Sequence, residues 1–260
     1  MIKKIIFRGL FILFFFIFFV IYLAPADKIL SFVDLPKNVK LYSIKGDLWE
    51  GHIDTIDIDD YRVKNVRWEL DFFTLVFARG ITIGIRDDKL AKGTFGLNVF
   101  DLDKELYLSR VDLKSNIANL LPYLKLPFPV KADGLIQTDI AHLAIKKNGD
   151  LKSINGKIVI RDAFLVHPFD PDLEIDLGKI SMNIENPRGN VEKIEVNLEQ
   201  ESSMFKTQRM KITITNLKDI EVDGVIKPKG SMPESLVNLI TMFGKPDADG
   251  NVRISYKGTI

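Results

Sequence analysis

The sequence contains no cysteine among its 260 residues. A disulfide framework, thiol catalysis and cysteine-ligated metal sites are therefore excluded, although this absence does not identify the cell compartment. Net charge is also nearly absent. The formal charge is +1, and Lys3, Lys4 and Arg8 supply three positive charges, so the residues after Leu23 sum to about −2 (one minus three). Such a balance provides no basic surface for nucleic acid.

The sequence also lacks the motifs of common catalytic sites. Its three histidines, His52, His142 and His167, lie on separate predicted elements and show no His-x-His or His-Glu-x-x-His spacing. No serine occupies a Gly-x-Ser-x-Gly elbow, and Gly93-Thr-Phe-Gly96 is not a dinucleotide-binding turn. We therefore expect no enzymatic activity, no catalytic residue, no cofactor and no metal site.

Two acidic stretches are candidates for cation sites. Around one predicted turn the sequence places Asp54, Asp57, Asp59 and Asp60. Their oxygen atoms suit a divalent cation, but a solvated turn is the favoured interpretation. Asp247-Ala-Asp249-Gly250 does not fit an EF-hand, since Lys245 stands two residues before Asp247 and Tyr256 at the twelfth position. It is predicted to be a turn.

Residues 5–23 form the one long apolar run, which is rich in phenylalanine and isoleucine and interrupted by Arg8. About 20 such residues cross a hydrocarbon core of about 30 Å. Because the basic residues precede the run, the positive-inside rule predicts a cytoplasmic N-terminus and, in a Gram-negative cell, a periplasmic remainder. Ala24-Pro-Ala26 leaves a cleaved signal peptide open, but the length of the run and Pro25 favour an uncleaved anchor. Residues 27–33 are expected to continue helically as a neck that Pro36 ends.

Both tryptophans, Trp49 and Trp68, lie close together in residues 41–70. Two runs with alternating apolar residues, 53–58 and 63–70, are joined by Asp59-Asp60-Tyr61 and predict a β-hairpin. Because tryptophan buries a large apolar area, we expect the core of the sheet to begin here. A contact surface for a partner or an acyl chain is the alternative role for the two rings.

The rest of the chain shows alternating patterns separated by polar turns, which predicts an antiparallel meander without helical crossovers. Residues 72–77 are interpreted as a link or a strand edge. Asn116 is expected to cap a helix over residues 117–124, and residues 233–243 form an amphipathic helix that Gly244 ends. The strand candidates are 81–85, 95–99, 106–108, 111–113, 135–145, 154–160, 164–166, 173–184, 191–198, 210–214, 220–226 and 252–256.

The predicted fold class is mainly β: a single N-terminal transmembrane helix, then a large curved antiparallel sheet of meander or groove-like form with one or two short helices. Residues 1–34 comprise the cytoplasmic tip, the membrane helix and the neck. Residues 35–260 form a periplasmic β-rich domain, with an internal break suggested near 116–132, where prolines interrupt the pattern.

The phrase Gly46-Asp-Leu-Trp-Glu-Gly51, followed by Val66-Arg-Trp-Glu-Leu70, resembles the signature of the type II secretion system protein N family. The resemblance continues through Gly224-Val-Ile-Lys-Pro228 and Gly244-Lys-Pro-Asp-Ala-Asp-Gly250, and it includes the single N-terminal membrane segment. It marks eight motif positions with a structural or partner-contact role: Gly46, Trp49, Gly51, Trp68, Gly224, Gly244, Pro246 and Gly250.

This resemblance implies a single-pass inner-membrane protein that acts without bond chemistry in the export of folded proteins across the outer membrane. Its periplasmic β-domain would dock other secretion subunits through a strand edge or an apolar patch. A second hypothesis is a lipid-handling scaffold, because an anchor followed by a long curved sheet is also the layout of AsmA-like bridge proteins, whose grooves hold acyl chains. The two hypotheses need not exclude each other.

Overall fold

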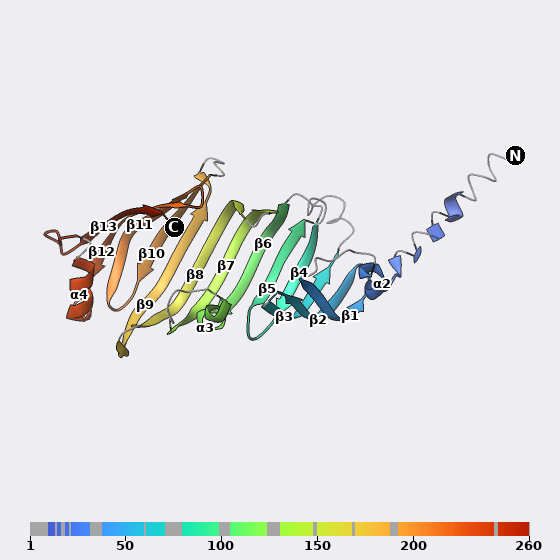
Figure 1. Cartoon of the computed structure of the whole chain (residues 1–260), viewed down its shortest axis with the longest axis horizontal. Coiled ribbons are helices and arrows are strands. Elements are labelled where there is room, and N and C mark those ends of the chain that lie inside the picture. The colour runs from blue at the N-terminus through green and yellow to red at the C-terminus, as the bar shows by residue number, and fades with distance from the viewer. Residues whose placement is uncertain are drawn as a thin grey trace. The chain divides into compact units, whose positions relative to one another are not determined.

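A computed structural model of the chain describes residues 10–13, 15–16, 19–20, 22–31, 38–59, 61–70, 80–98, 105–123, 131–147, 150–167, 170–187, 192–241 and 244–259 (Figure 1). The chain divides into two compact units, Met1–Asp87 and Asp88–Ile260, hereafter unit 1 and unit 2. Each unit is described by itself. The predicted boundary near residue 34 and the predicted break near 116–132 stay predictions.

Unit 1 begins with the predicted apolar segment. Its described residues between 10 and 22 are helical, and most of their large side chains are exposed. Among the residues that the structure describes, no helix combines the length and the apolar character needed to cross a membrane. The predicted neck helix is confirmed in shortened form as α2 (Ala26–Leu30), which follows Pro25. Pro36 lies outside the described residues.

The strands of unit 1 are β1 (Val39–Gly46), β2 (Glu50–Ile58), β3 (Tyr61–Glu69) and β4 (Gly80–Arg86). Each pairs with the next in antiparallel fashion, so the predicted hairpin over residues 53–70 is confirmed as β2 and β3. Its buried apolar side chains are Ile53, Val66 and Leu70. The stretch at 72–77 lies outside the described residues.

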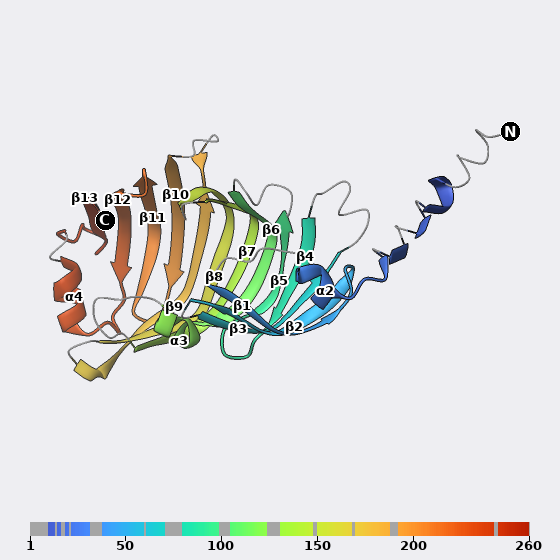
Figure 2. The ribbon, with the colours of Figure 1, turned by 45° about the vertical axis from the view of Figure 1, so that its right-hand side comes forward.

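Unit 2 is an antiparallel meander in which every strand pairs with its successor, as predicted. Figure 2 shows that its strands are twisted and curved. The strands are β5 (Lys92–Asn98), β6 (Glu105–Asn116), β7 (Lys131–Lys146), β8 (Leu151–His167), β9 (Asp170–Glu185), β10 (Lys193–Glu201), β11 (Phe205–Thr215), β12 (Asp219–Pro228) and β13 (Val252–Thr259).

Two strands of unit 2 each join two separate strand candidates. The separate candidates 106–108 and 111–113 are one strand, β6, and the candidates 154–160 and 164–166 are one strand, β8. Arg110 and Asp162 have positive φ angles of 49° and 52° within these strands. The pairing register shifts beside both residues, so β-bulges interrupt the alternation without ending the strands.

The helices of unit 2 are short. Asn116 caps α3 (Ile117–Leu120) as predicted, because its Oδ1 accepts a hydrogen bond of 2.8 Å from the amide of Ala118. A 3-10 turn, η2 (Leu121–Tyr123), continues α3, which packs against β6 and β7. The predicted C-terminal helix is confirmed as α4 (Glu234–Thr241), and Figures 1 and 2 show it beside β12 and β13.

The main hydrophobic cluster lies in unit 2 and consists of Val111, Ile140, Ile154 and Ile194, from β6, β7, β8 and β10. Partly buried apolar residues of the same sheet pack against it. The expectation that the core begins at the hairpin of the two tryptophans is confirmed for its aliphatic side chains, since Ile53, Val66 and Leu70 are buried there. The two tryptophan rings themselves are only partly buried. The indole nitrogen of Trp49 donates to the carbonyl of Tyr22, and that of Trp68 donates to the carbonyl of Asp47.

Candidate functional site

The turn between β1 and β2 is built around the carboxylate of Asp47. Its Oδ1 accepts hydrogen bonds from the amides of Trp49 (2.8 Å) and Glu50 (3.0 Å), and its own amide donates to the carbonyl of Glu50 at 2.9 Å. Gly46 precedes this turn with φ of 109°, and a Cβ there would lie 2.3 Å from the Glu50 carbonyl oxygen. Only glycine fits this position without strain.

Trp68 packs on the far side of the same turn. It is the register partner of Gly51, and a Cβ added at Gly51 would lie 2.2 Å from Cζ2 of the Trp68 ring. The indole nitrogen of Trp68 donates to the Asp47 carbonyl at 3.2 Å. The structure therefore brings together four predicted motif positions, Gly46, Trp49, Gly51 and Trp68.

Trp49 joins this turn to the N-terminal segment. Its ring lies 5.2 Å from the ring of Tyr22, and its Nε1 donates to the Tyr22 carbonyl at 3.2 Å. A short antiparallel bridge also connects Pro25 with Asp47. We call the group formed by Tyr22, Pro25, Asp47 and Trp49 the neck dock. Nothing in the sequence pattern relates Tyr22 to Trp49, so this contact was not predicted.

The other four motif positions lie in unit 2. A Cβ on Gly224 would lie 2.9 Å from the Arg209 carbonyl oxygen, and one on Gly244 would lie 2.5 Å from that of Arg253. Pro246 forms a bridge with Val252, and Gly250 has φ of 77°. Gly244, Pro246 and Gly250 lie in a turn that folds back against the start of β13, whereas Gly224 lies within β12, between β11 and β13.

The predicted turn at Asp247 is confirmed. The Asp247 carboxylate accepts hydrogen bonds from the amides of Asp249 (2.9 Å) and Asn251 (2.8 Å) and from the Asn251 side chain (2.9 Å). These bonds, above all that of the Asn251 side chain, hold the pKa of Asp247 below its usual value. The carboxylate stabilises its own turn.

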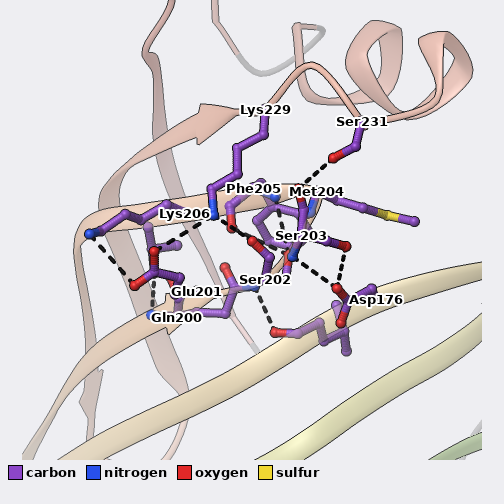
Figure 3. Close-up of polar contacts among 12 residues, drawn as sticks. Asp176, Gln200, Glu201, Ser202, Ser203, Met204, Phe205, Lys206, Lys229 and Ser231 are labelled. Carbon is purple, nitrogen blue, oxygen red and sulfur yellow. Dashed lines mark hydrogen bonds and ion pairs between the residues drawn. The ribbon is translucent and has the colours of Figure 1, made fainter.

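A second polar group, absent from the sequence prediction, surrounds the turn between β10 and β11 (Figure 3). Asp176 of β9 accepts hydrogen bonds from the amide of Ser203 (2.9 Å), from the Ser203 hydroxyl and from the amide of Gly178 (2.8 Å). The Ser203 hydroxyl is the largest of the influences that lower the pKa of Asp176. Ser231, which precedes α4, donates to the Ser203 carbonyl.

Beside this turn lies a buried pair, Gln200 and Thr207, each 5% exposed. The Gln200 amide donates to the Thr207 hydroxyl at 2.6 Å, and that hydroxyl donates to the Gln200 carbonyl at 3.2 Å. The Gln200 side chain also donates to the Leu177 carbonyl at 2.7 Å. These hydrogen bonds lie at the bulge where the register between β10 and β11 shifts, and they connect β9, β10 and β11.

The histidine and acidic side chains that could bind a metal ion or act in catalysis lie apart from one another. In the described part of the chain, no group of three or more histidine, aspartate or glutamate side chains is arranged to hold a metal ion. Asp57 forms a two-bond ion pair with Arg62 at 2.7 and 2.8 Å. His52 lies 3.4 Å from Asp54, and His142 stacks on Tyr107. Asp60 lies outside the described residues. The features of the described residues that remain as candidates for a function are therefore the hydrogen-bonded turns and the edges of the strands.

Comparison with known proteins gives a consistent result. The chain matches the family described as Type II secretion system (T2SS), protein N, over residues 37–255. It is similar to the Type II secretion system protein N of Aeromonas hydrophila, with 23% identity over 270 residues that cover 99% of each chain. The protein of the same name from Vibrio cholerae is 21% identical over 251 residues, which cover 91% of each chain. No solved structure matches the chain.

Proposed function

The chain belongs to the type II secretion system protein N family, and on that premise we propose that it is a non-enzymatic inner-membrane component of a type II secretion system. The observation that carries the proposal is the family match over residues 37–255, together with similarity along 99% of the Aeromonas hydrophila relative. In this role the protein supports the export of folded proteins across the outer membrane by holding other subunits in place.

Residues 5–23 are the proposed anchor, with the N-terminus in the cytoplasm and the β-rich remainder in the periplasm. The support is the apolar run itself and the exposure of its described side chains, among them Leu10, Ile12 and Phe16. Such side chains lose contact with water when they enter a bilayer, which is favourable by about 25 cal/mol for each Å² removed from water. Lys3, Lys4 and Arg8 before the run favour this orientation.

The outer edge of β13 is the proposed contact with another subunit. In unit 2, β13 is the last strand of the meander and pairs with β12. The Gly244–Pro246 turn lies against its first two residues, Val252 and Arg253. Among the residues that the structure describes, no strand pairs with the outer side of the segment that follows, from Ile254 to Thr259. Such an edge strand is a template for an added strand of another chain.

A complementation experiment tests the proposed function. The gene is deleted in its own host, and the export of proteins that depend on type II secretion is measured in the culture medium. We expect export to fall in the deletion strain and to recover with the full chain, whereas a chain that is released into the periplasm by a cleavable signal should not restore it. Unchanged export in the deletion strain would contradict the proposal.

The partner contact is tested by site-specific photocrosslinking in cells. A photoreactive residue at Ser255 or Lys257, both exposed on β13, should give an adduct with another secretion subunit. The matched control places the same residue at Lys218, in the exposed turn between β11 and β12. Equal adduct patterns at all three positions would count against a specific role of the edge.

The lipid-handling alternative stays a prediction. The apolar cluster of Val111, Ile140, Ile154 and Ile194 is buried by residues of the same sheet, and this burial does not by itself favour an acyl ligand. Mass spectrometry of lipids that co-purify with residues 25–260, which lack the proposed anchor, tests the lipid-handling hypothesis. A stoichiometric lipid would favour the scaffold with bound acyl chains.

A further inference from the structure

We propose that the β1–β2 turn lies in the headgroup region of the lipid bilayer, with Trp49 and Tyr22 as the side chains that contact it. The inference rests on the proposed membrane anchor and extends it, because it assigns a lipid-contacting role to a turn of the β-rich unit. The partner is the interfacial layer of a phospholipid membrane.

The first argument is connectivity within unit 1. Trp49 donates its indole proton to the Tyr22 carbonyl at 3.2 Å, and Pro25 pairs with Asp47 two residues earlier in the turn. The turn is therefore fastened to the chain at the point where the apolar segment ends. If that segment spans the bilayer, the turn has to lie within a few residues of the membrane surface.

The second argument is the chemistry of the paired rings. Tryptophan and tyrosine concentrate at membrane–water interfaces, because each has an apolar body and one polar group. Trp49 is partly buried and Tyr22 is 44% exposed, and their rings lie 5.2 Å apart with planes inclined by 42°. The neighbouring Leu23 is 70% exposed, so apolar surface continues up to the turn.

The third argument is the end of the helix. The last carbonyls of any α-helix have no amide partner within the helix. Near hydrocarbon, a backbone carbonyl without a partner is costly, since no water replaces the missing donor. Tyr22 is the last helical residue described before the chain turns at Leu23, and the Trp49 indole supplies a donor to its carbonyl. This is a structural reason for tryptophan at position 49, since Phe cannot donate this bond.

The test uses depth-dependent fluorescence quenching of the full chain in phosphatidylcholine–phosphatidylglycerol vesicles. The Trp68→Phe variant leaves Trp49 as the single tryptophan, and the vesicles carry a nitroxide either at the headgroup or near the end of the acyl chain. We expect the headgroup nitroxide to reduce Trp49 emission and the chain-end nitroxide to leave it nearly unchanged. The Trp49→Phe variant, which retains Trp68 against Gly51, should show weaker quenching by the headgroup probe.

An alkaline wash of the same vesicles tests the membrane anchor separately from the headgroup contact of Trp49. A chain that remains in the vesicles while Trp49 is unquenched by either probe would overturn the headgroup contact and leave the anchor standing. A chain that the wash releases would overturn both. Circular dichroism of each variant confirms that the β-rich part is folded, so the quenching result reports the position of Trp49.

Discussion

The indole ring of Trp68 lies directly against Gly51, its partner across β2 and β3, so that a Cβ at position 51 would fall 2.2 Å from Cζ2 of the ring. The Lys45 carbonyl oxygen lies 2.5 Å from the same point on the other side. Gly51 is therefore held between a backbone group and a ring, and the pairing of β1, β2 and β3 at this end depends on a residue without a side chain.

We expect Gly51→Ala to lower the free energy of unfolding of unit 1 by about 1–3 kcal/mol, the usual cost of overpacking. Urea titration followed by tryptophan fluorescence measures this effect, because both tryptophans of the chain lie in unit 1. The double variant Gly51→Ala with Trp68→Phe is the control: the smaller ring removes the contact with Cζ2 while the Lys45 carbonyl oxygen stays 2.5 Å from the added Cβ, so only part of the loss should be recovered. Additive losses in the two variants would show that the close contact is not the cause.

A second prediction concerns the Asp47 turn. Asp47→Ala removes the acceptor of the Trp49 and Glu50 amides, and we expect it to lower the free energy of unfolding by about 1–2 kcal/mol. Asp47→Asn keeps the acceptor oxygen and should retain most of the stability. The same variants should differ in Trp49 emission, with a red shift for alanine alone. Equal midpoints for alanine and asparagine would contradict the assigned role of the carboxylate oxygen.

The sequence predicted the strands of this fold well, because alternation is a local signal. It identified the hairpin at 53–70, the helices that became α3 and α4, and the antiparallel order without crossovers. It could not predict bulges. The register shifts between Leu198 and Gln200 on β10, and between Thr207 and Arg209 on β11. Because alternation fails at these bulges, one strand candidate ends at residue 198 and the next begins at residue 210. In the structure, β10 continues to Glu201 and β11 already begins at Phe205.

The contacts that join distant segments were also beyond the sequence pattern. Asp176 and Ser203 are 27 residues apart, as are Tyr22 and Trp49. Neither pair has a local spacing that a helix or a strand would impose. The motif glycines could be noted because glycine marks tight turns, but the reason for Gly51 is the Trp68 ring across the sheet, which only the pairing register reveals.

A third prediction concerns the buried hydroxyl of Thr207. Thr207→Val conserves the shape of the side chain but leaves the buried amide of Gln200 without the acceptor it has at 2.6 Å. We expect a loss of about 1–3 kcal/mol in the stability of unit 2, the penalty for an unsatisfied buried donor. Thermal unfolding followed by circular dichroism measures it, because unit 2 contains no tryptophan. Thr207→Ser keeps the hydroxyl and should lose less, and the reverse ranking would show that the methyl group matters more.

The last prediction is a pH dependence at Asp176. The hydroxyl and the amide of Ser203 favour its ionised form and lower its pKa in the folded protein. A carboxyl group whose pKa is lower in the folded state than in the unfolded state stabilises the fold above the unfolded value of about 3.9, and this contribution is lost as the pH falls through the lower folded value. Asp176→Asn should therefore be less stable than the unsubstituted protein at neutral pH, by about 1–2 kcal/mol.

The difference between the two proteins should shrink as the pH falls below about 4, because protonated aspartic acid no longer accepts these bonds as an anion. Urea unfolding by circular dichroism at several pH values measures this convergence. Ser203→Ala gives the matched variant: it removes the hydroxyl donor and keeps the amide donor, so its loss at neutral pH should be smaller and should disappear over the same pH range. A constant difference between Asp176→Asn and the unsubstituted protein at all pH values would mean that packing at this position, and not the charge of Asp176, stabilises the turn between β10 and β11.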